Sequence, residues 1–120
     1  MNKGVIGFVV AVSLVVTVAI GRPYYLEYQA QKVIAKAQRV IKSYLVDPDS
    51  ANFKVEKVLS DNSGSIVCGE VNSKNRAGGY NGFHRFIWAS YADGDKIAVS
   101  GENIQDRFDI SYWDIFCKPN

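Results

Sequence analysis

The stretch from Asn72 to Gly82 holds most of the side chains that could do chemistry in this chain of 120 residues. Three glycines, at positions 78, 79 and 82, suggest backbone angles that other residues resist. Six side chains in or beside this stretch could contact a partner: Lys74, Asn75, Arg76, Tyr80, Asn81 and His84. The stretch fits a long connection between two strands. The functional alternative is a binding loop that presents these side chains to a partner or an anionic group.

No residue pattern in the chain is typical of an enzyme. His84 is the only histidine, so a zinc site would lack both a second imidazole and a spare thiol. No serine stands in a context typical of a nucleophile, and neither glycine pattern that binds phosphates is present. Glu70 and Arg85 are expected to pair across neighbouring strands in a structural role. We therefore predict no enzymatic activity, no cofactor, no metal and no small-molecule substrate.

The charge of the chain argues against nucleic-acid binding. Lys3 is the only charged residue before Arg22, so the rest of the chain carries 13 of the 14 basic residues and all 12 acidic ones. The resulting net charge of +1 is far from the concentrated basic face that nucleic-acid binding needs.

The most distinctive feature elsewhere is an uncharged, strongly apolar run from Gly4 to Gly21. Its eighteen residues would form about 27 Å of helix, close to the hydrocarbon thickness of a bilayer. We expect residues 4–21 to enter the inner membrane, with residues 1–22 as an anchor and 23–120 as a small domain. The alternative is a signal peptide cut after Ala19 or Gly21, although neither site has the favoured Ala-x-Ala pattern.

Two observations disagree about which side of the membrane the domain occupies. Basic residues that follow the apolar run outnumber Lys3 before it, and by the positive-inside rule they favour a cytoplasmic domain: Arg22, Lys32, Lys36, Arg39 and Lys42. However, the chain has two cysteines, Cys68 and Cys117, and such a pair in a small exported domain usually forms a disulfide. The alternative is two buried, reduced thiols. We expect the extracytoplasmic orientation.

Residues 24–46 are expected to form one amphipathic helix. Apolar side chains recur at spacings of three and four, as in Val33, Ala37 and Val40, while the basic residues take the other faces. Those basic faces are solvated or contact anionic lipid headgroups. Gly21 and Pro23 favour a kink or short break before this helix, and Asp47-Pro48 ends it.

Three tyrosines begin this helix, at positions 24, 25 and 28. They fit an aromatic belt at the membrane surface, or the first turn of packing in the domain's core.

The remaining chain predicts a sheet and a closing helix. Four strands are expected at residues 53–59, 65–72, 83–91 and 96–100, with turns at 61–64 and at Asp93-Gly94. From Glu102 to Cys117 an i+4 apolar spacing predicts a helix, while alternation around Ile110 leaves a strand open. The aromatic residues expected in the core are Trp88, Trp113 and Tyr112. The predicted fold class is α+β, with the long helix packed on an antiparallel sheet of about four strands.

Two segments carry a resemblance to a known group of proteins. They are "DPDSANF", residues 47–53, and "VCGEVNSKNRAGGYNGFHRF", residues 67–86. Together they resemble small envelope proteins of Gram-negative bacteria and their phages and prophages. The resemblance covers residues 33–117 and implies an exported domain with a structural disulfide. It provides no catalytic residue.

The expected function is therefore binding rather than catalysis. We expect a single-pass inner-membrane protein whose periplasmic domain binds another protein of the envelope. Because the resembling group occurs in phages, superinfection exclusion is one role that fits. The alternatives are an inhibitor of a lysozyme-type cell-wall hydrolase, with the loop around Arg76 and Tyr80 in the enzyme's cleft, or a structural subunit of an envelope complex.

Overall fold

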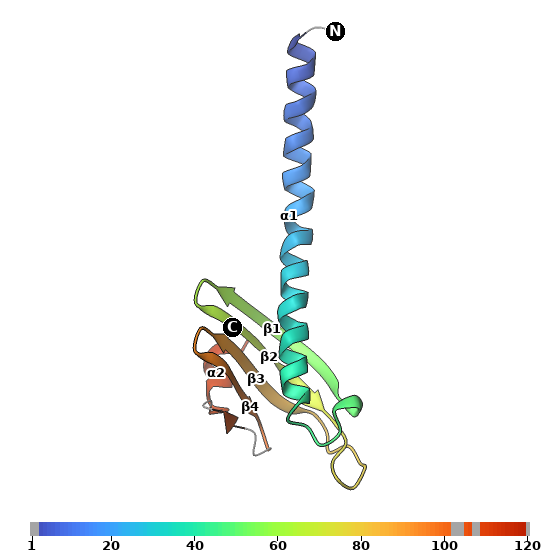
Figure 1. Ribbon diagram of the computed structural model, residues 1–120, viewed down its shortest axis with the longest axis vertical. Helices are drawn as coiled ribbons and strands as arrows, with labels where there is room; N and C mark the ends of the chain where they lie inside the picture. Colours follow the sequence, from blue (N-terminus) through green and yellow to red (C-terminus); the bar gives the residue numbers. More distant parts are fainter. Residues whose placement is uncertain (1–2, 102–104, 107–108, 120) are drawn as a thin grey trace. The chain divides into compact units, whose positions relative to one another are not determined.

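The computed structural model of the protein describes residues 3–101, 105–106 and 109–119, and side chains from residue 21 onward with the exception of residues 23 and 105–106. Clustering of contacts divides the chain into two compact units, Met1–Lys32 and Val33–Asn120. The elements, labelled in Figure 1, are α1 (Lys3–Lys42), the short 3-10 helix η1 (Pro48–Ser50), β1 (Asn52–Asp61), β2 (Gly64–Asn72), β3 (His84–Tyr91), β4 (Gly94–Val99), β5 (Gln105–Asp106) and α2 (Tyr112–Phe116).

Helix α1 is continuous through Gly21 and Pro23, so the expectation of a break there is wrong. A proline inside a helix removes one N–H donor and crowds the carbonyl of the residue four positions earlier, yet the turns on either side continue the helix here. Side chains of the expected membrane segment, residues 4–21, lie outside the described residues except at Gly21. Within the part of α1 whose side chains are described, no stretch is long and apolar enough to cross a membrane.

The helix ends at Lys42, four residues earlier than predicted. The backbone N–H groups of Tyr44 and Leu45 bond three residues back, to the carbonyl oxygens of Ile41 and Lys42, which tightens the last turn. The Ser43 hydroxyl also donates to the Val40 carbonyl over 2.6 Å. Asp47-Pro48 then starts η1, as expected of a residue pair that stops a helix.

The sheet is an antiparallel meander in the order β1-β2-β3-β4-β5. The four predicted strands are present, with ends shifted by at most two residues. Both predicted turns join neighbouring strands, and they place Asp61 opposite Gly64 and Tyr91 opposite Gly94. The pairing of β1 with β2 shifts between Val55 and Lys57, where one extra residue forms a bulge.

The helix predicted over 102–117 is largely wrong. Gln105–Asp106 is a short strand, with Gln105 opposite Ala98, and only Tyr112–Phe116 is α-helical; residues 102–104 and 107–108 lie outside the described residues. Asp109 explains the late start, because its carboxylate accepts a hydrogen bond from the Ser111 N–H over 2.8 Å. An aspartate that binds the backbone this way favours a turn over a helix interior.

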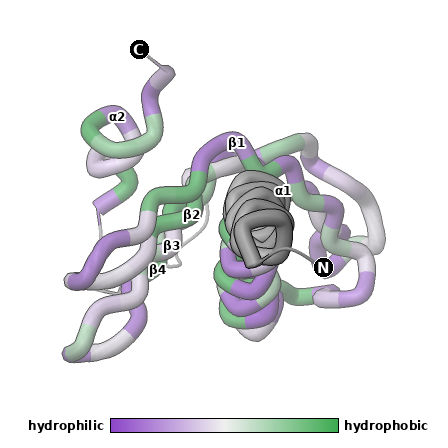
Figure 2. Tube along the Cα trace, turned by 90° about the horizontal axis from the view of Figure 1, so that it is seen from above, coloured by the Kyte–Doolittle hydropathy of each residue, from purple (hydrophilic) through white to green (hydrophobic). Residues whose placement is uncertain are grey.

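Both faces of the sheet are covered. The last turns of α1 pack Ala37 and Ile41 against one face, and α2 with the following residue packs Trp113 and Cys117 against the other. Figure 2, viewed along α1, shows these turns on one side of the sheet and α2 on the opposite side. The strands supply a core on each face because successive side chains alternate: Val67, Val71, Phe86, Trp88, Ile97 and Val99 toward α1, and Ile66, Cys68, Ile87, Ala89 and Ala98 toward α2.

Polar contacts add to this packing beside α1. The Lys36 ammonium lies 3.5 Å from the Asp95 carboxylate, donates to the Ser90 hydroxyl over 3.1 Å and sits 5.5 Å from the centre of the Trp88 ring. Lys36, one of the basic residues of this helix, therefore contacts the sheet.

The predicted burial of Trp88 and Trp113 is confirmed, but Tyr112 is 42% exposed and the prediction that it is core is wrong. Tyr112 is the first residue of α2, and its ring stacks on that of Phe116.

The Cys68–Cys117 disulfide joins β2 to the residue that follows α2. Both half-cystines are buried, and the alternative of two reduced thiols does not hold in this structure. The bond fixes the C-terminal segment on the face of the sheet opposite α1.

Candidate functional site

The candidate site is the loop between β2 and β3, residues 73–83, together with the segments around it. It is the yellow loop beyond the ends of β2 and β3 in Figure 1. The only regular pairing in it is an antiparallel bridge between Lys74 and Tyr80, which closes the loop on itself. Gly78 and Gly82 have φ angles of 81° and 96°, left-handed values that favour glycine. The turn therefore has a defined backbone rather than being an open connection.

Asn75 organises the loop. Its side-chain oxygen accepts hydrogen bonds from the backbone N–H groups of Ala77 and Gly79, over 2.9 and 3.2 Å. Its amide nitrogen donates to the side-chain oxygen of Asn81 over 3.0 Å, and its backbone N–H donates to the Gly79 carbonyl over 2.9 Å. One amide side chain thus holds both arms of the loop, so Asn75 and Asn81 have a positioning role.

Ser50 connects η1 to the loop. The backbone N–H of Lys74 donates to the Ser50 hydroxyl oxygen over 2.8 Å, and the Tyr80 hydroxyl donates to the Ser50 carbonyl over 2.9 Å. The Ser50 hydroxyl in turn donates to the Asp47 carbonyl. The two segments that carry the sequence resemblance therefore contact each other directly in the folded domain.

A cavity of about 430 Å³ lies between this loop and the chain that follows α1. Its lining joins three residues after the helix to seven from the loop and the start of β3: Tyr44, Leu45, Val46, Ser73, Lys74, Asn75, Arg76, Ala77, Asn81 and His84. Two of these, Lys74 and Arg76, are cationic, one is a histidine, and none is acidic. The cavity thus combines an apolar wall with a cationic one.

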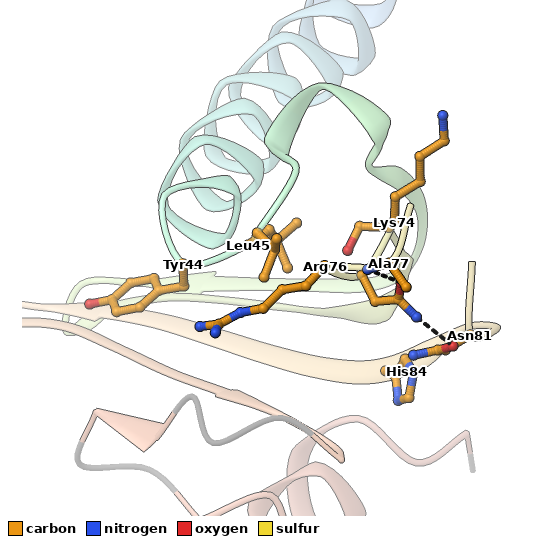
Figure 3. Close-up of a pocket in the computed structure, with 10 residues that line it drawn as sticks. Tyr44, Leu45, Lys74, Arg76, Ala77, Asn81 and His84 are labelled. Carbon is orange, nitrogen blue, oxygen red and sulfur yellow. Dashed lines mark hydrogen bonds between the residues drawn. The ribbon is translucent and has the colours of Figure 1, made fainter. Parts of the chain in front are cut away.

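Arg76 is the most available charge at this site. Its side chain is exposed, and no carboxylate in the described part of the chain lies within ion-pair distance of it. Figure 3 shows the Arg76 side chain running beneath Leu45 toward the ring of Tyr44, whereas Lys74 points the other way. The Lys74 ammonium lies 5.9 Å from the centre of the Tyr80 ring. The two cations are therefore presented at opposite sides of the loop.

The structure brings together five of the six predicted side chains around the cavity. Tyr80 is the exception: it does not line the cavity, and its hydroxyl is bonded to Ser50. Sequence reasoning missed Tyr44, Leu45 and Val46 as part of the site, because they fall within the helix expected over residues 24–46. Because α1 ends at Lys42, the side chains of Tyr44 and Val46 are exposed. No sequence pattern indicates the i→i−3 backbone hydrogen bonds that end the helix there.

Other predicted contacts take a different form. Glu70 and Arg85 do lie opposite each other in the pairing of β2 with β3. The Arg85 guanidinium carbon, however, lies 4.6 Å from the centre of the Trp113 ring, so Arg85 helps to hold α2. His84 is half-buried, and Gly101 approaches its ring so closely that an added Cβ would lie 3.1 Å from Nδ1.

Two carboxylates have shifted pKa values, and neither lines the cavity. The Ser63 hydroxyl, the Ser63 N–H and the Gly64 N–H donate to Asp61 and lower its pKa from 3.8. Hydrogen bonds from Ser111 lower the pKa of Asp109 in the same way. Both are turn residues whose ionised form caps backbone donors.

Among the described residues, no three histidine, cysteine, aspartate or glutamate side chains gather in a way that could hold a metal ion. Comparisons of the chain with models of protein families, with curated proteins and with solved structures gave no match. The residues of the site offer a cationic and apolar binding surface on a loop whose backbone is held by hydrogen bonds.

Proposed function

We propose that this chain is a membrane-anchored, non-enzymatic envelope protein whose periplasmic domain binds another protein through the 73–83 loop and its cavity. The observation that carries the proposal is Arg76, which pairs with no carboxylate among the described residues, on a loop whose backbone is fixed by Asn75. A loop held in one conformation loses little conformational entropy on binding, so its contacts count more toward affinity.

The character of the surface indicates the kind of partner. Arg76 and the exposed side chains of Tyr44 and Val46 line the same cavity, so cationic and apolar contacts are available together. Arginine and tyrosine are enriched where protein partners meet. The proposed partner presents a carboxylate next to an apolar side chain.

The orientation in the periplasm is supported by the Cys68–Cys117 disulfide, since such bonds persist in oxidising compartments. In a phage-encoded copy, binding a protein of the inner membrane or periplasm would block entry of a second phage's DNA. This role rests on the resemblance of residues 47–53 and 67–86 to envelope proteins that include phage members.

A photo-crosslinking amino acid at position 76 tests the proposal in cells that express the full chain. We expect an adduct of one defined mass that disappears when Asn75→Ala is added. The same amino acid at Ala92, exposed in the turn between β3 and β4, is the matched control and should give no such adduct. Equal adducts from both positions, or an adduct indifferent to Asn75→Ala, would overturn the proposal.

Inhibition of a cell-wall hydrolase is a second candidate, favoured by the same Arg76. Lysozyme-type clefts contain a pair of carboxylates, which an arginine on an ordered loop could enter. The purified chain in mild detergent should then slow the lysis of cell-wall suspensions, and Arg76→Glu should remove the effect while Arg39→Glu keeps it. Equal activity of the Arg76→Glu variant would exclude this candidate.

A further inference from the structure

The first unit of the chain contains a band of large exposed side chains on α1. Tyr24, Tyr25, Leu26 and Tyr28 are 70%, 62%, 59% and 57% exposed. Four large apolar or aromatic side chains within five residues of one helix form a patch that favours an environment other than water.

The band surrounds much of the helix instead of forming a stripe. At about 100° per residue, the side chains from Tyr24 to Leu26 spread over about 200° of the helix circumference, with Tyr25 and Tyr28 between them. A protein that packs on a helix contacts a narrower stripe, about 100° wide. A surrounding medium such as a lipid bilayer contacts all sides.

The length of the band along the helix fits one layer of a bilayer. Residues 24–28 span about 6 Å of helix axis, and the headgroup layer on each side of the hydrocarbon is about 5–7 Å thick. The band directly follows the apolar run of residues 4–21, whose length matches the hydrocarbon itself. Tyrosine is one of the two residue types enriched in this layer, because its ring is apolar and its hydroxyl is polar.

The charged residues near the band are placed as this layer requires. Lys32 lies one turn beyond Tyr28, and its ammonium is 4.6 Å from the centre of the Tyr28 ring. Arg22, on the other side, has a long side chain that can extend toward the headgroups. Glu27 lies within the band, where its carboxylate would contact hydrated headgroups rather than hydrocarbon.

We propose that Tyr24, Tyr25, Leu26 and Tyr28 form an interfacial belt that lies in the headgroup layer and sets the depth of α1 in the membrane. The inference rests on the anchor in the proposed function and adds a defined lipid contact to it. The belt fixes the point at which α1 leaves the bilayer, so residues from Gln29 onward lie in water.

Depth-dependent quenching tests the belt with the full chain reconstituted in phosphatidylcholine vesicles brominated near the headgroup end of the acyl chains. The variants are Tyr25→Trp and, as the matched control, Gln31→Trp, an exposed site about 9 Å further along the helix. The native chain gives the background, because Trp88 and Trp113 are buried in the folded domain. We expect bromine to quench the Tyr25→Trp emission about twofold more than the Gln31→Trp emission, since quenching decreases with distance over this range.

The outcomes distinguish the belt from the anchor. Equal quenching in the two variants, with the chain still floating with the vesicles, would overturn the belt and leave the anchor intact. A blue-shifted Tyr25→Trp emission that bromine does not quench would show that a protein, such as a second copy, covers the band. A chain that fails to float with the vesicles would overturn the anchor and the belt together.

Discussion

Loss of the Cys68–Cys117 bond should destabilise the domain and release its C-terminal segment first. The bond joins residues 49 positions apart, and the chain-entropy relation gives about 4 kcal/mol for closing a loop of that length. This is a large part of the roughly 5–15 kcal/mol by which a small domain is stable.

The local effect follows from the size of α2. Its five residues are far fewer than an isolated helix needs, so tertiary contacts must hold it. Burial of Trp113 contributes roughly 4–6 kcal/mol, whereas ordering residues 109–117 costs about 9 kcal/mol or more. The disulfide therefore adds stabilisation that the segment needs to stay in place. Without it, the segment should detach and expose the apolar side chains of Ile66 and Ile87.

Urea unfolding of the full chain in mild detergent measures the first effect, with the Cys68→Ala/Cys117→Ala variant compared with the oxidised protein. We expect the free energy of unfolding to fall by about 4 kcal/mol. Hydrogen exchange measures the second: residues 109–117 should lose protection before β2 and β3 do. Reduced native protein is the control and should match the double variant. A loss below about 1 kcal/mol, or unchanged exchange at 109–117, would refute the reasoning.

Three further predictions follow from single side chains. Gly69→Ala should lower the free energy of unfolding, measured by urea titration, by about 3 kcal/mol, because the new Cβ would lie 2.1 Å from the Lys54 carbonyl oxygen. The control Gly79→Ala, at a site with open space for a Cβ, should change that free energy by less than about 0.5 kcal/mol. Asn75→Ala should speed amide exchange in the loop, measured by NMR, while costing about 1 kcal/mol of stability; unchanged loop exchange would contradict its positioning role. Because the pKa of Asp61 is lowered in the folded state, its contribution to the free energy of unfolding should be complete above pH 3.8 and be lost as the pH falls below that value through the folded pKa. Asp61→Asn should remove this part of the pH dependence of the urea midpoint. An NMR titration that gives the carboxyl a pKa at or above 3.8 would contradict the prediction.

The sheet could be predicted from the sequence because its signals are local. Alternating side chains gave the four long strands, and polar turn residues joined by glycines gave two hairpins and hence the meander order. The secondary structure of the final segment could not be predicted in the same way, since the apolar spacing from Ile104 to Phe116 favours a helix and the alternation around Ile110 favours a strand. Asp109, by binding the Ser111 backbone, favours a turn there, and no periodicity reports that contact.

The candidate site could be predicted only in part. Glycines and cations marked the 73–83 loop, but the organising role of Asn75 depends on backbone donors that only the folded loop brings within reach. The cavity depends on where α1 ends: it ends four residues earlier than predicted, and Tyr44 and Val46, which were expected to be helical, line the cavity instead. Contacts between distant segments, such as Ser50 with Tyr80, leave no pattern in a single sequence.

The measurement that most directly tests the central claim is the topology and thiol state of the full chain in Gram-negative cells. Asn62→Cys places a thiol in the exposed turn between β1 and β2, and a membrane-impermeant maleimide is added to spheroplasts. We expect a chain of uncleaved mass with one label, and labels on Cys68 and Cys117 only after reduction and unfolding. Labelling at position 62 only after the inner membrane is opened, with Cys68 and Cys117 reactive in unfolded protein without reductant, would contradict the anchored periplasmic protein proposed here.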